Sequence, residues 1–308
     1  MKFVTAKKDG VTFVGFVDDE KGRVLPLNQV EEVRSGEKSF PSSMIKCIAS
    51  GENFINKVDQ LLDWVQHQIN VDSFYIPIED LTILAPIPRP EKNIFCVGKN
   101  YAEHAIEMGS AEDIPKDVMV FTKAPTTVIA PNGTILSHHN VTSQLDYEGE
   151  LAVIIGKQGR AIKKEEALDY VFGYTIINDV TARDLQSRHK QFFIGKSLDT
   201  TCPMGPWIVH KSMIDNPNHL DIQTKVNGEV RQNSNTKNFI FPVEEVISVL
   251  SAGMTLEPGD IIATGTPAGV GKGFTPPKFL QSDDQIEISI EGIGTLINKV
   301  GDNEACEL

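Results

Sequence analysis

Two glutamates stand two residues apart at the start of an apolar run in QLDYEGELAVII, residues 144–155. Such a run predicts a strand, so Glu148 and Glu150 would share one face, roughly 6.5 to 7 Å apart along the chain. Carboxylates that face each other at the mouth of an apolar strand are costly to ionise unless a cation lies between them. The pair therefore predicts a divalent metal site. An exposed edge strand is the alternative, because Glu-x-Glu is a common pattern.

A third carboxylate, Asp179, ends a second apolar run in FGYTIINDVTARD, residues 172–184. Its position would let a third oxygen ligand join the pair from a neighbouring strand. Three carboxylates without a nearby Cys or His pair favour a hard ion, Mg²⁺ or Mn²⁺, over zinc.

A histidine and a glutamate lie three residues apart in VGKNYAEHAIEMG, residues 97–109, where a strand is followed by a predicted helix with Asn100 as its cap. His104 and Glu107 would share one helical face, and a carboxylate beside an imidazole raises its basicity and fixes its orientation. The pair predicts a general base, with a surface ion pair as the alternative. The polar, Gly- and Pro-marked residues 109–116 that follow are typical of a mobile loop, so the helix would act as a lid.

Several polar residues near these carboxylates are candidates for binding an anionic substrate. Lys123 follows the apolar run VMVFT, Lys196 lies in FFIGKSLDTTCPMGP, and Arg183, Asp184 and Gln186 come just after the third carboxylate. Lysines beside apolar strands more often extend along the surface than bind ligands. Beside three carboxylates, however, a cation would hold substrate carboxylates or developing negative charge.

The Gly-rich stretch ATGTPAGVGKG, residues 263–273, lacks the spacing of a phosphate-binding loop and precedes no helical pattern. A nucleotide site is therefore not expected there. Its backbone N–H groups and Thr266 would form a turn that binds a carboxylate.

Acidic residues outnumber basic ones by 42 to 29, which gives the 308-residue chain a net charge of −13. Such a surface repels polyanions, so nucleic acid and acidic membranes are not expected partners. The four cysteines (47, 96, 202 and 306) show no CxxC spacing and are expected to be spectator thiols in a reducing compartment. The first residues alternate like a strand, and no apolar run is long enough for membrane insertion, so a cytoplasmic protein is expected.

Two regions with different secondary-structure patterns predict two domains, residues 1–88 and 89–308. The first contains a β-hairpin made by VTFVGFV and GRVLPL, then helical patterns at 44–49 and 54–68. Three prolines in LTILAPIPRPEKN mark the boundary. Beyond it, many short apolar runs and only a few helical patterns, at 164–170, 180–190 and 243–252, predict a β-rich α+β fold resembling a sandwich or barrel.

Six motifs, in this order over residues 93–300, resemble the fumarylacetoacetate hydrolase family: NYAEHAIEMG, MVFTKAPTTVIAP, QLDYEGELAVIIG, GYTIINDVTARDLQ, GKSLDTTCPMGPWIV and ATGTPAGVG. Within the family the chain is similar to the bacterial YisK-like subgroup, whose members have an extra N-terminal domain and act as oxaloacetate decarboxylases. The resemblance implies a mixed β-roll or barrel catalytic domain preceded by a small α+β domain, and a homodimer.

The resemblance also assigns roles to residues. It implies Mg²⁺ or Mn²⁺ on Glu148, Glu150 and Asp179, and catalytic roles for His104 and Glu107 in a lid helix. Lys196 would be a catalytic cation on the substrate side, and the implied substrate-binding residues are Lys123, Arg183, Gln186 and Thr266.

The substrates implied by the resemblance are a small 2-oxo dicarboxylic acid or an acylpyruvate. A 2-oxo acid would chelate the ion, which then serves as an electron sink for the carbon beside the ketone. We expect decarboxylation of oxaloacetate to pyruvate and CO₂ through a metal-bound enolate. Hydrolysis of an acylpyruvate or fumarylpyruvate, with water activated by the His–Glu pair, and oxaloacetate keto–enol tautomerisation are alternatives. A scaffold or regulatory protein is the non-enzymatic alternative.

Overall fold

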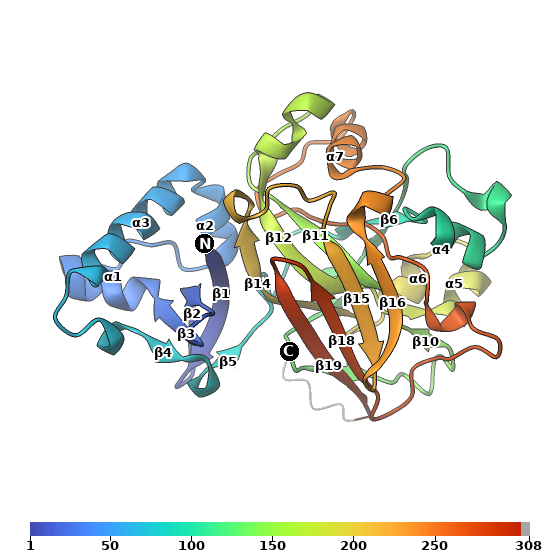
Figure 1. Cartoon of the computed structure of the whole chain (residues 1–308), viewed down its shortest axis with the longest axis horizontal. Helices are drawn as coiled ribbons and strands as arrows, with labels where there is room; N and C mark the ends of the chain where they lie inside the picture. Colours follow the sequence, from blue (N-terminus) through green and yellow to red (C-terminus); the bar gives the residue numbers. More distant parts are fainter. Residues whose placement is uncertain (303–308) are drawn as a thin grey trace.

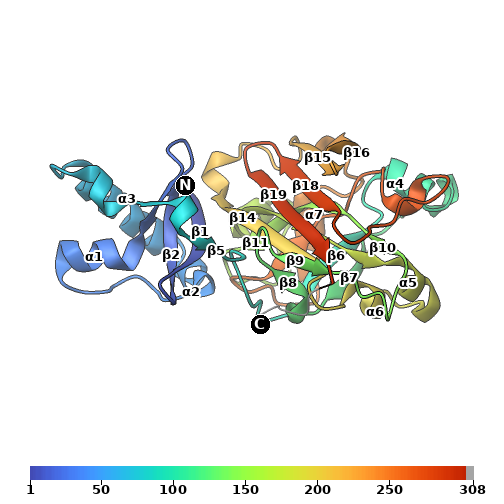
Figure 2. The ribbon, with the colours of Figure 1, turned by 90° about the horizontal axis from the view of Figure 1, so that it is seen from below.

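Apolar strands build one large mixed sheet and a smaller antiparallel-rich sheet in the computed structural model, which describes residues 1–302 (Figures 1 and 2). The large sheet has twelve strands in the order β4-β3-β2-β1-β14-β12-β11-β17-β6-β7, with β5 paired to β1 and β8 to β14. The second has five strands in the order β16-β15-β18-β19-β9, and β10 pairs with β13. The strand-rich mixed fold expected from the sequence is confirmed.

The strand bounds are β1 Lys2–Lys8, β2 Val11–Asp18, β3 Arg23–Pro26, β4 Ile76–Pro77, β5 Thr82–Ile83, β6 Ile94–Gly98, β7 Met119–Lys123, β8 Val128–Ile129, β9 Thr134–Leu136, β10 Leu145–Asp146, β11 Gly149–Ile155, β12 Val171–Asn178, β13 Thr181–Ala182, β14 Cys202–His210, β15 Asp221–Val226, β16 Glu229–Asn235, β17 Ile261–Ala263, β18 Gln285–Ile290 and β19 Gly294–Gly301.

The α-helices are α1 Leu27–Ser35, α2 Met44–Ala49, α3 Glu52–Gln66, α4 Ala102–Glu107, α5 Arg183–His189, α6 Phe193–Lys196 and α7 Val243–Ser251. The helical patterns at 44–49, 54–68 and 243–252 are confirmed as α2, α3 and α7. The pattern at 180–190 shortens to α5, and the pattern at 164–170 is a 3₁₀ helix. None of these helices, within the described residues, is long and apolar enough to cross a membrane.

Strands β11 and β12 form the centre of the large sheet and are buried along their whole length. Because successive side chains point to opposite faces, Leu151 and Val153 enter one core, while Ala152 and Ile154 enter another. The five-stranded sheet and α7 cover the first face. Burial on both faces explains why these strands are continuous apolar runs.

The N-terminal region joins the large sheet directly, as Figure 1 shows on its left side. Strand β1 pairs antiparallel with β14, with Phe3 opposite Ile208. The predicted hairpin is confirmed, because β2 and β3 pair antiparallel. Helices α2 and α3 pack on the second core, where the rings of Phe3 and Phe54 lie 4.9 Å apart. The domain boundary near residue 88 stays a prediction.

Three cysteines, at positions 47, 96 and 202, are buried free thiols, and their spectator role stays a prediction. Cys306 lies outside the described residues.

Candidate metal and substrate site

The predicted strand over residues 144–155 is interrupted where the glutamates begin. Tyr147 and Glu148 separate β10 from β11, so only Glu150 lies within the long strand. The edge-strand alternative is wrong for this segment, because β11 lies between β12 and β17 and both glutamates are buried. The break allows the chain to pair with β13 before it enters the large sheet.

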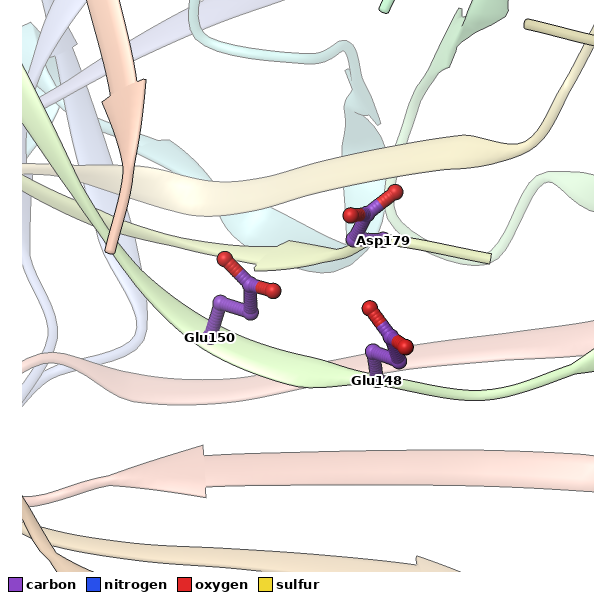
Figure 3. A group of neighbouring side chains, drawn as sticks. All are labelled: Glu148, Glu150 and Asp179. Atoms are coloured by element: carbon purple, nitrogen blue, oxygen red, sulfur yellow. The ribbon is translucent and has the colours of Figure 1, made fainter. Parts of the chain in front are cut away.

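Two hydrogen bonds that involve the backbone of Glu148 hold the third carboxylate beside the other two. The N–H of Glu148 donates to the side-chain oxygen of Asn178 at 3.0 Å, and the N–H of Asp179 donates to the carbonyl of Glu148 at 2.8 Å. One carboxylate oxygen from each of the three acids lies within 4.8 Å of the other two. Figure 3 shows the three side chains grouped between neighbouring segments.

A glycine lets the two sheets meet directly beneath this group. A Cβ on Gly149 would lie 2.3 Å from the Thr224 hydroxyl of β15, closer than any side chain tolerates. The small residue between the two glutamates therefore brings the five-stranded sheet against the metal-site segment.

Glu150 is a buried carboxylate that no cationic side chain of residues 1–302 neutralises. The pKa of Glu150 is raised well above its usual range by burial, then by Asp179 and Glu148. Its carboxylate accepts a hydrogen bond from Gly265 N–H at 2.8 Å, but no lysine, arginine or histidine within residues 1–302 lies within 4.0 Å. Both oxygens of Asp179 are buried and face lysines, Oδ1 at 2.8 Å from Lys123 and Oδ2 at 2.6 Å from Lys196. Three buried carboxylates whose oxygens lie within 4.8 Å of one another, one of them on a glutamate without an ion-pair partner in residues 1–302, fit a hard divalent ion.

Three buried cations, Lys196, Arg183 and Lys123, contact Glu148 and Asp179. Nζ of Lys196 lies 2.7 Å from Glu148 and 2.6 Å from Asp179, and Nη2 of Arg183 lies 2.7 Å from Glu148. Burial raises the pKa of Glu148, but the positive charges of Lys196 and Arg183 outweigh it and hold the pKa below its usual range. Glu148 therefore stays ionised beside Glu150.

Lys123 contacts the site from behind. Its ammonium group is fully buried, lies 2.8 Å from Oδ1 of Asp179 and donates to the Val180 carbonyl at 3.0 Å. It does not line the cavity in front of the carboxylates. Its contacts are those of a group that positions Asp179, and its predicted binding of substrate stays a prediction.

The His–Glu pair forms on a short helix that faces the carboxylates. Nδ1 of His104 lies 3.3 Å from Glu107, and the other oxygen of Glu107 accepts the Gly269 N–H at 2.9 Å. The glutamate thus ties α4 to the Gly-rich stretch and orients the imidazole. Asn100 does not cap this helix: Tyr101 is the N-cap residue, and the Asn100 side chain bonds to Phe241 and Thr264 instead.

A cavity of about 190 Å³ opens in front of the glutamates. Of the predicted site residues, it is lined by His104, Glu148, Glu150, Arg183, Gln186, Lys196 and Thr266. Gln186 accepts from Arg183 at 3.3 Å, and Thr266 donates to the Gly149 carbonyl at 3.0 Å. Asp184 does not line it and instead accepts a hydrogen bond from Thr142.

Sequence reasoning missed three charged residues around this cavity: Asp146, Lys99 and Lys272. Asp146 is fully buried and binds Arg183 Nε at 2.8 Å. The sequence could have indicated Asp146, because it lies two residues before Glu148 and so continues the spacing of the two glutamates. Lys99 lies in the loop between β6 and α4, and Lys272 lies in a short 3₁₀ helix, Gly271–Gly273, so neither belongs to a long periodic element.

The fold and this site define a member of the fumarylacetoacetate hydrolase family. The family described as "Fumarylacetoacetate (FAA) hydrolase C-terminal" matches residues 93–301, so the chain belongs to it.

Among curated relatives, the chain is 56% identical to oxaloacetate tautomerase YisK of Bacillus subtilis, over 98% of this chain and 100% of the relative. Among solved structures, it is similar to a fumarylacetoacetate hydrolase from Exiguobacterium antarcticum, with 43% identity, a TM-score of 0.80 and coverage of 98% and 100%. A maleylpyruvate hydrolase from Sphingobium sp. SYK-6, solved with manganese(II) and pyruvate, matches at 27% identity, a TM-score of 0.75 and coverage of 98% and 99%.

Proposed function

We propose that this protein is a divalent-metal-dependent enzyme that interconverts the keto and enol forms of oxaloacetate. The observation that carries the proposal is a cavity lined by Glu148, Glu150 and His104, with Asp179 grouped beside the two glutamates and Glu107 orienting the imidazole. The relative that is 56% identical and named oxaloacetate tautomerase supports the choice of substrate and reaction. Compared with the decarboxylation expected from the resemblance, tautomerisation needs only proton transfers, which the pair supplies.

Glu148, Glu150 and Asp179 would hold Mg²⁺ or Mn²⁺. When bound, the ion would polarise the 2-oxo group and lower the cost of negative charge on its oxygen. Lys196 and Arg183 hold Glu148 ionised for this purpose, and Lys123 positions Asp179.

Proton transfer falls to His104. Because Nδ1 faces the Glu107 carboxylate, Nδ1 carries the proton and Nε2 is left as the base. Nε2 takes a proton from C3 of the keto form, and the electron pair of that C–H bond becomes the C2–C3 double bond. Nε2 then returns that proton to the C2 oxygen, which completes the enol and restores the neutral imidazole, and the reverse sequence restores the ketone.

Decarboxylation of oxaloacetate is the second candidate. The related hydrolase that binds manganese(II) and pyruvate fits this candidate and acylpyruvate hydrolysis alike, since pyruvate would be a product of both reactions. Hydrolysis of an acylpyruvate would use the same His–Glu pair to activate water. Two of the similar solved structures are named hydrolases, so the test below includes this reaction. The predicted homodimer and cytoplasmic location stay predictions.

The test follows oxaloacetate with Mn²⁺ by the absorbance of its enol form, in parallel with a pyruvate-coupled assay and an acetylpyruvate sample. The variant is Glu148→Gln, and the control is Glu79→Gln, an exposed carboxylate in the N-terminal region. Faster keto–enol equilibration without pyruvate, lost in Glu148→Gln only, is the expected result. Pyruvate above the metal-only background identifies a decarboxylase, and turnover of acetylpyruvate alone identifies a hydrolase. No turnover of any substrate contradicts the enzyme proposal and leaves the scaffold alternative.

A further inference from the structure

Five basic side chains line the cavity: Lys99, His104, Arg183, Lys196 and Lys272. The first four are already engaged by carboxylates, with Lys99 bound to Asp113 at 3.3 Å. Lys272 differs, because no carboxylate within residues 1–302 lies within 4.0 Å of its ammonium nitrogen. The cavity therefore has one basic group whose charge is not neutralised by the protein.

The backbone of Lys272 is fixed beside Arg183 by the buried carboxylate of Asp146. One oxygen of Asp146 accepts the Gly271 N–H at 2.7 Å, and the other accepts the Lys272 N–H at 3.1 Å and Arg183 Nε at 2.8 Å. A Cβ on Gly271 would lie 2.6 Å from the same carboxylate, so this close approach requires glycine. The lysine is thus held at a fixed place on the cavity wall although its side chain is exposed.

We propose that Lys272 binds the second carboxylate of the substrate and makes the site selective for 2-oxo dicarboxylic acids. This inference rests on the proposed function, in which the 2-oxo acid end of oxaloacetate lies at the three carboxylates. The opposite end of the same molecule then needs a basic group that is not already paired, and Lys272 is that group.

The electrostatics of the wall agree with this assignment. The pKa of the Lys272 ammonium is lowered by its partial burial against the cavity wall and then by the positive charge of Arg183. A carboxylate placed beside Lys272 would relieve the repulsion between the two cations. A substrate without that carboxylate would gain nothing there, so the interaction separates dicarboxylic from monocarboxylic acids.

The kinetic test compares Lys272→Met, Lys272→Arg and the control Lys278→Met, with Mn²⁺ saturating. Lys278 is an exposed lysine of the same loop that pairs with Glu229 and does not line the cavity. The substrates are oxaloacetate and its 4-amide, which has the same size but lacks the second negative charge.

Lys272→Met should raise KM for oxaloacetate by about 10- to 100-fold, the range for a hydrogen bond between charged groups, and change kcat little. KM for the amide should not change, and Lys272→Arg should restore most of the oxaloacetate affinity.

A binding experiment separates this inference from the proposed function. Calorimetry with Mn²⁺ compares pyruvate with 3,3-difluoro-oxaloacetate, a dicarboxylate that cannot enolise. If Lys272→Met removes the preference for the dicarboxylate while pyruvate binding is unchanged, the assignment of Lys272 holds even for a protein that turns over no oxaloacetate. Equal losses for both ligands, or no loss for either, would overturn it.

Discussion

At the scale of single residues, Glu150 is the carboxylate of the metal group that has no ion-pair partner within residues 1–302. It is buried beside two other carboxylates, and its pKa is raised by burial, Asp179 and Glu148 in that order. Without a metal ion the ionised side chain opposes folding, because a buried charge without an ion-pair partner is costly. With the ion bound, the same charge becomes a ligand.

The substitution Glu150→Gln should therefore separate stability from metal binding. In EDTA, we expect a melting temperature equal to or above that of the wild type, because the amide keeps the size and removes the charge. Mn²⁺ at 100 times its Kd should stabilise the wild type by about 2.7 kcal/mol and leave the variant unchanged. Thermal unfolding with EDTA and with Mn²⁺ measures both effects, with Glu79→Gln as the control. A variant that Mn²⁺ stabilises as strongly as the wild type would remove Glu150 from the ligand set.

Residue types and spacing predicted the carboxylate group, since alternation on a strand puts Glu148 and Glu150 on one face. They did not predict on which side of the carboxylates each lysine lies. Lys123 and Lys196 look alike in the sequence, each beside apolar residues, yet Lys123 lies behind Asp179 and Lys196 lines the cavity. That difference depends on how β7 and α6 pack, which no local pattern records.

At the scale of elements, α4 depends on tertiary contacts. A helix of six residues without a side-chain N-cap is marginal by itself. Asn100 holds its start: the amide nitrogen donates to the carbonyls of Phe241 and Thr264 at 3.0 and 2.8 Å, and the amide oxygen accepts the Phe241 N–H at 2.8 Å. The rings of Tyr101 and Phe239 add a contact at 5.0 Å.

Replacing Asn100 by Ala should weaken both the fold and catalysis. Each buried backbone group left unpaired costs about 1–3 kcal/mol, and α4 would lose its fixed position over the cavity. Urea unfolding should show the loss of stability, and kcat should fall because His104 is no longer held in place. The control is Asn93→Ala, which removes one exposed side-chain hydrogen bond. If kcat is retained in a folded Asn100→Ala protein, this anchor does not position the His–Glu pair.

Long periodic elements were predictable and short ones were not. The helical spacing of α3 and the apolar runs of β11 and β12 appear directly in the sequence, because each has a continuous buried face. The helix α1 was not predicted, because only Leu27, Val30 and Glu31 are buried along its nine residues. Its amphipathic signal is too weak to show without the packing partners.

At the scale of the whole molecule, one sheet crosses the predicted domain boundary. The pairing of β1 with β14 places the N-terminal strands and the strands next to the metal site in the same hydrogen-bonded layer. His210 ends β14 at this junction: its N–H donates to the Met1 carbonyl at 2.9 Å, and its ring packs edge-on against Phe172 at 5.3 Å. The stability of the junction is therefore linked to the charge of one histidine.

Protonation of His210 should destabilise the whole protein at acidic pH. Nδ1 accepts the Ser212 N–H at 3.3 Å, which an imidazolium cannot do, so protonation leaves Nδ1 only its contact with Ser212 Oγ at 2.9 Å. Burial, then the nearby amino terminus and Lys211, lower the pKa of His210 below 6.5. The unfolded state thus binds the proton more readily than the folded state. The stabilisation that the neutral ring provides is therefore complete above pH 6.5 and is lost as the pH falls below it.

In EDTA, the melting temperature should drop more between pH 7.5 and 5.5 for the wild type than for His210→Asn, whose amide oxygen replaces Nδ1 as acceptor. The exposed His67→Asn serves as control, and equal drops in all three proteins would show that His210 does not govern the acid sensitivity.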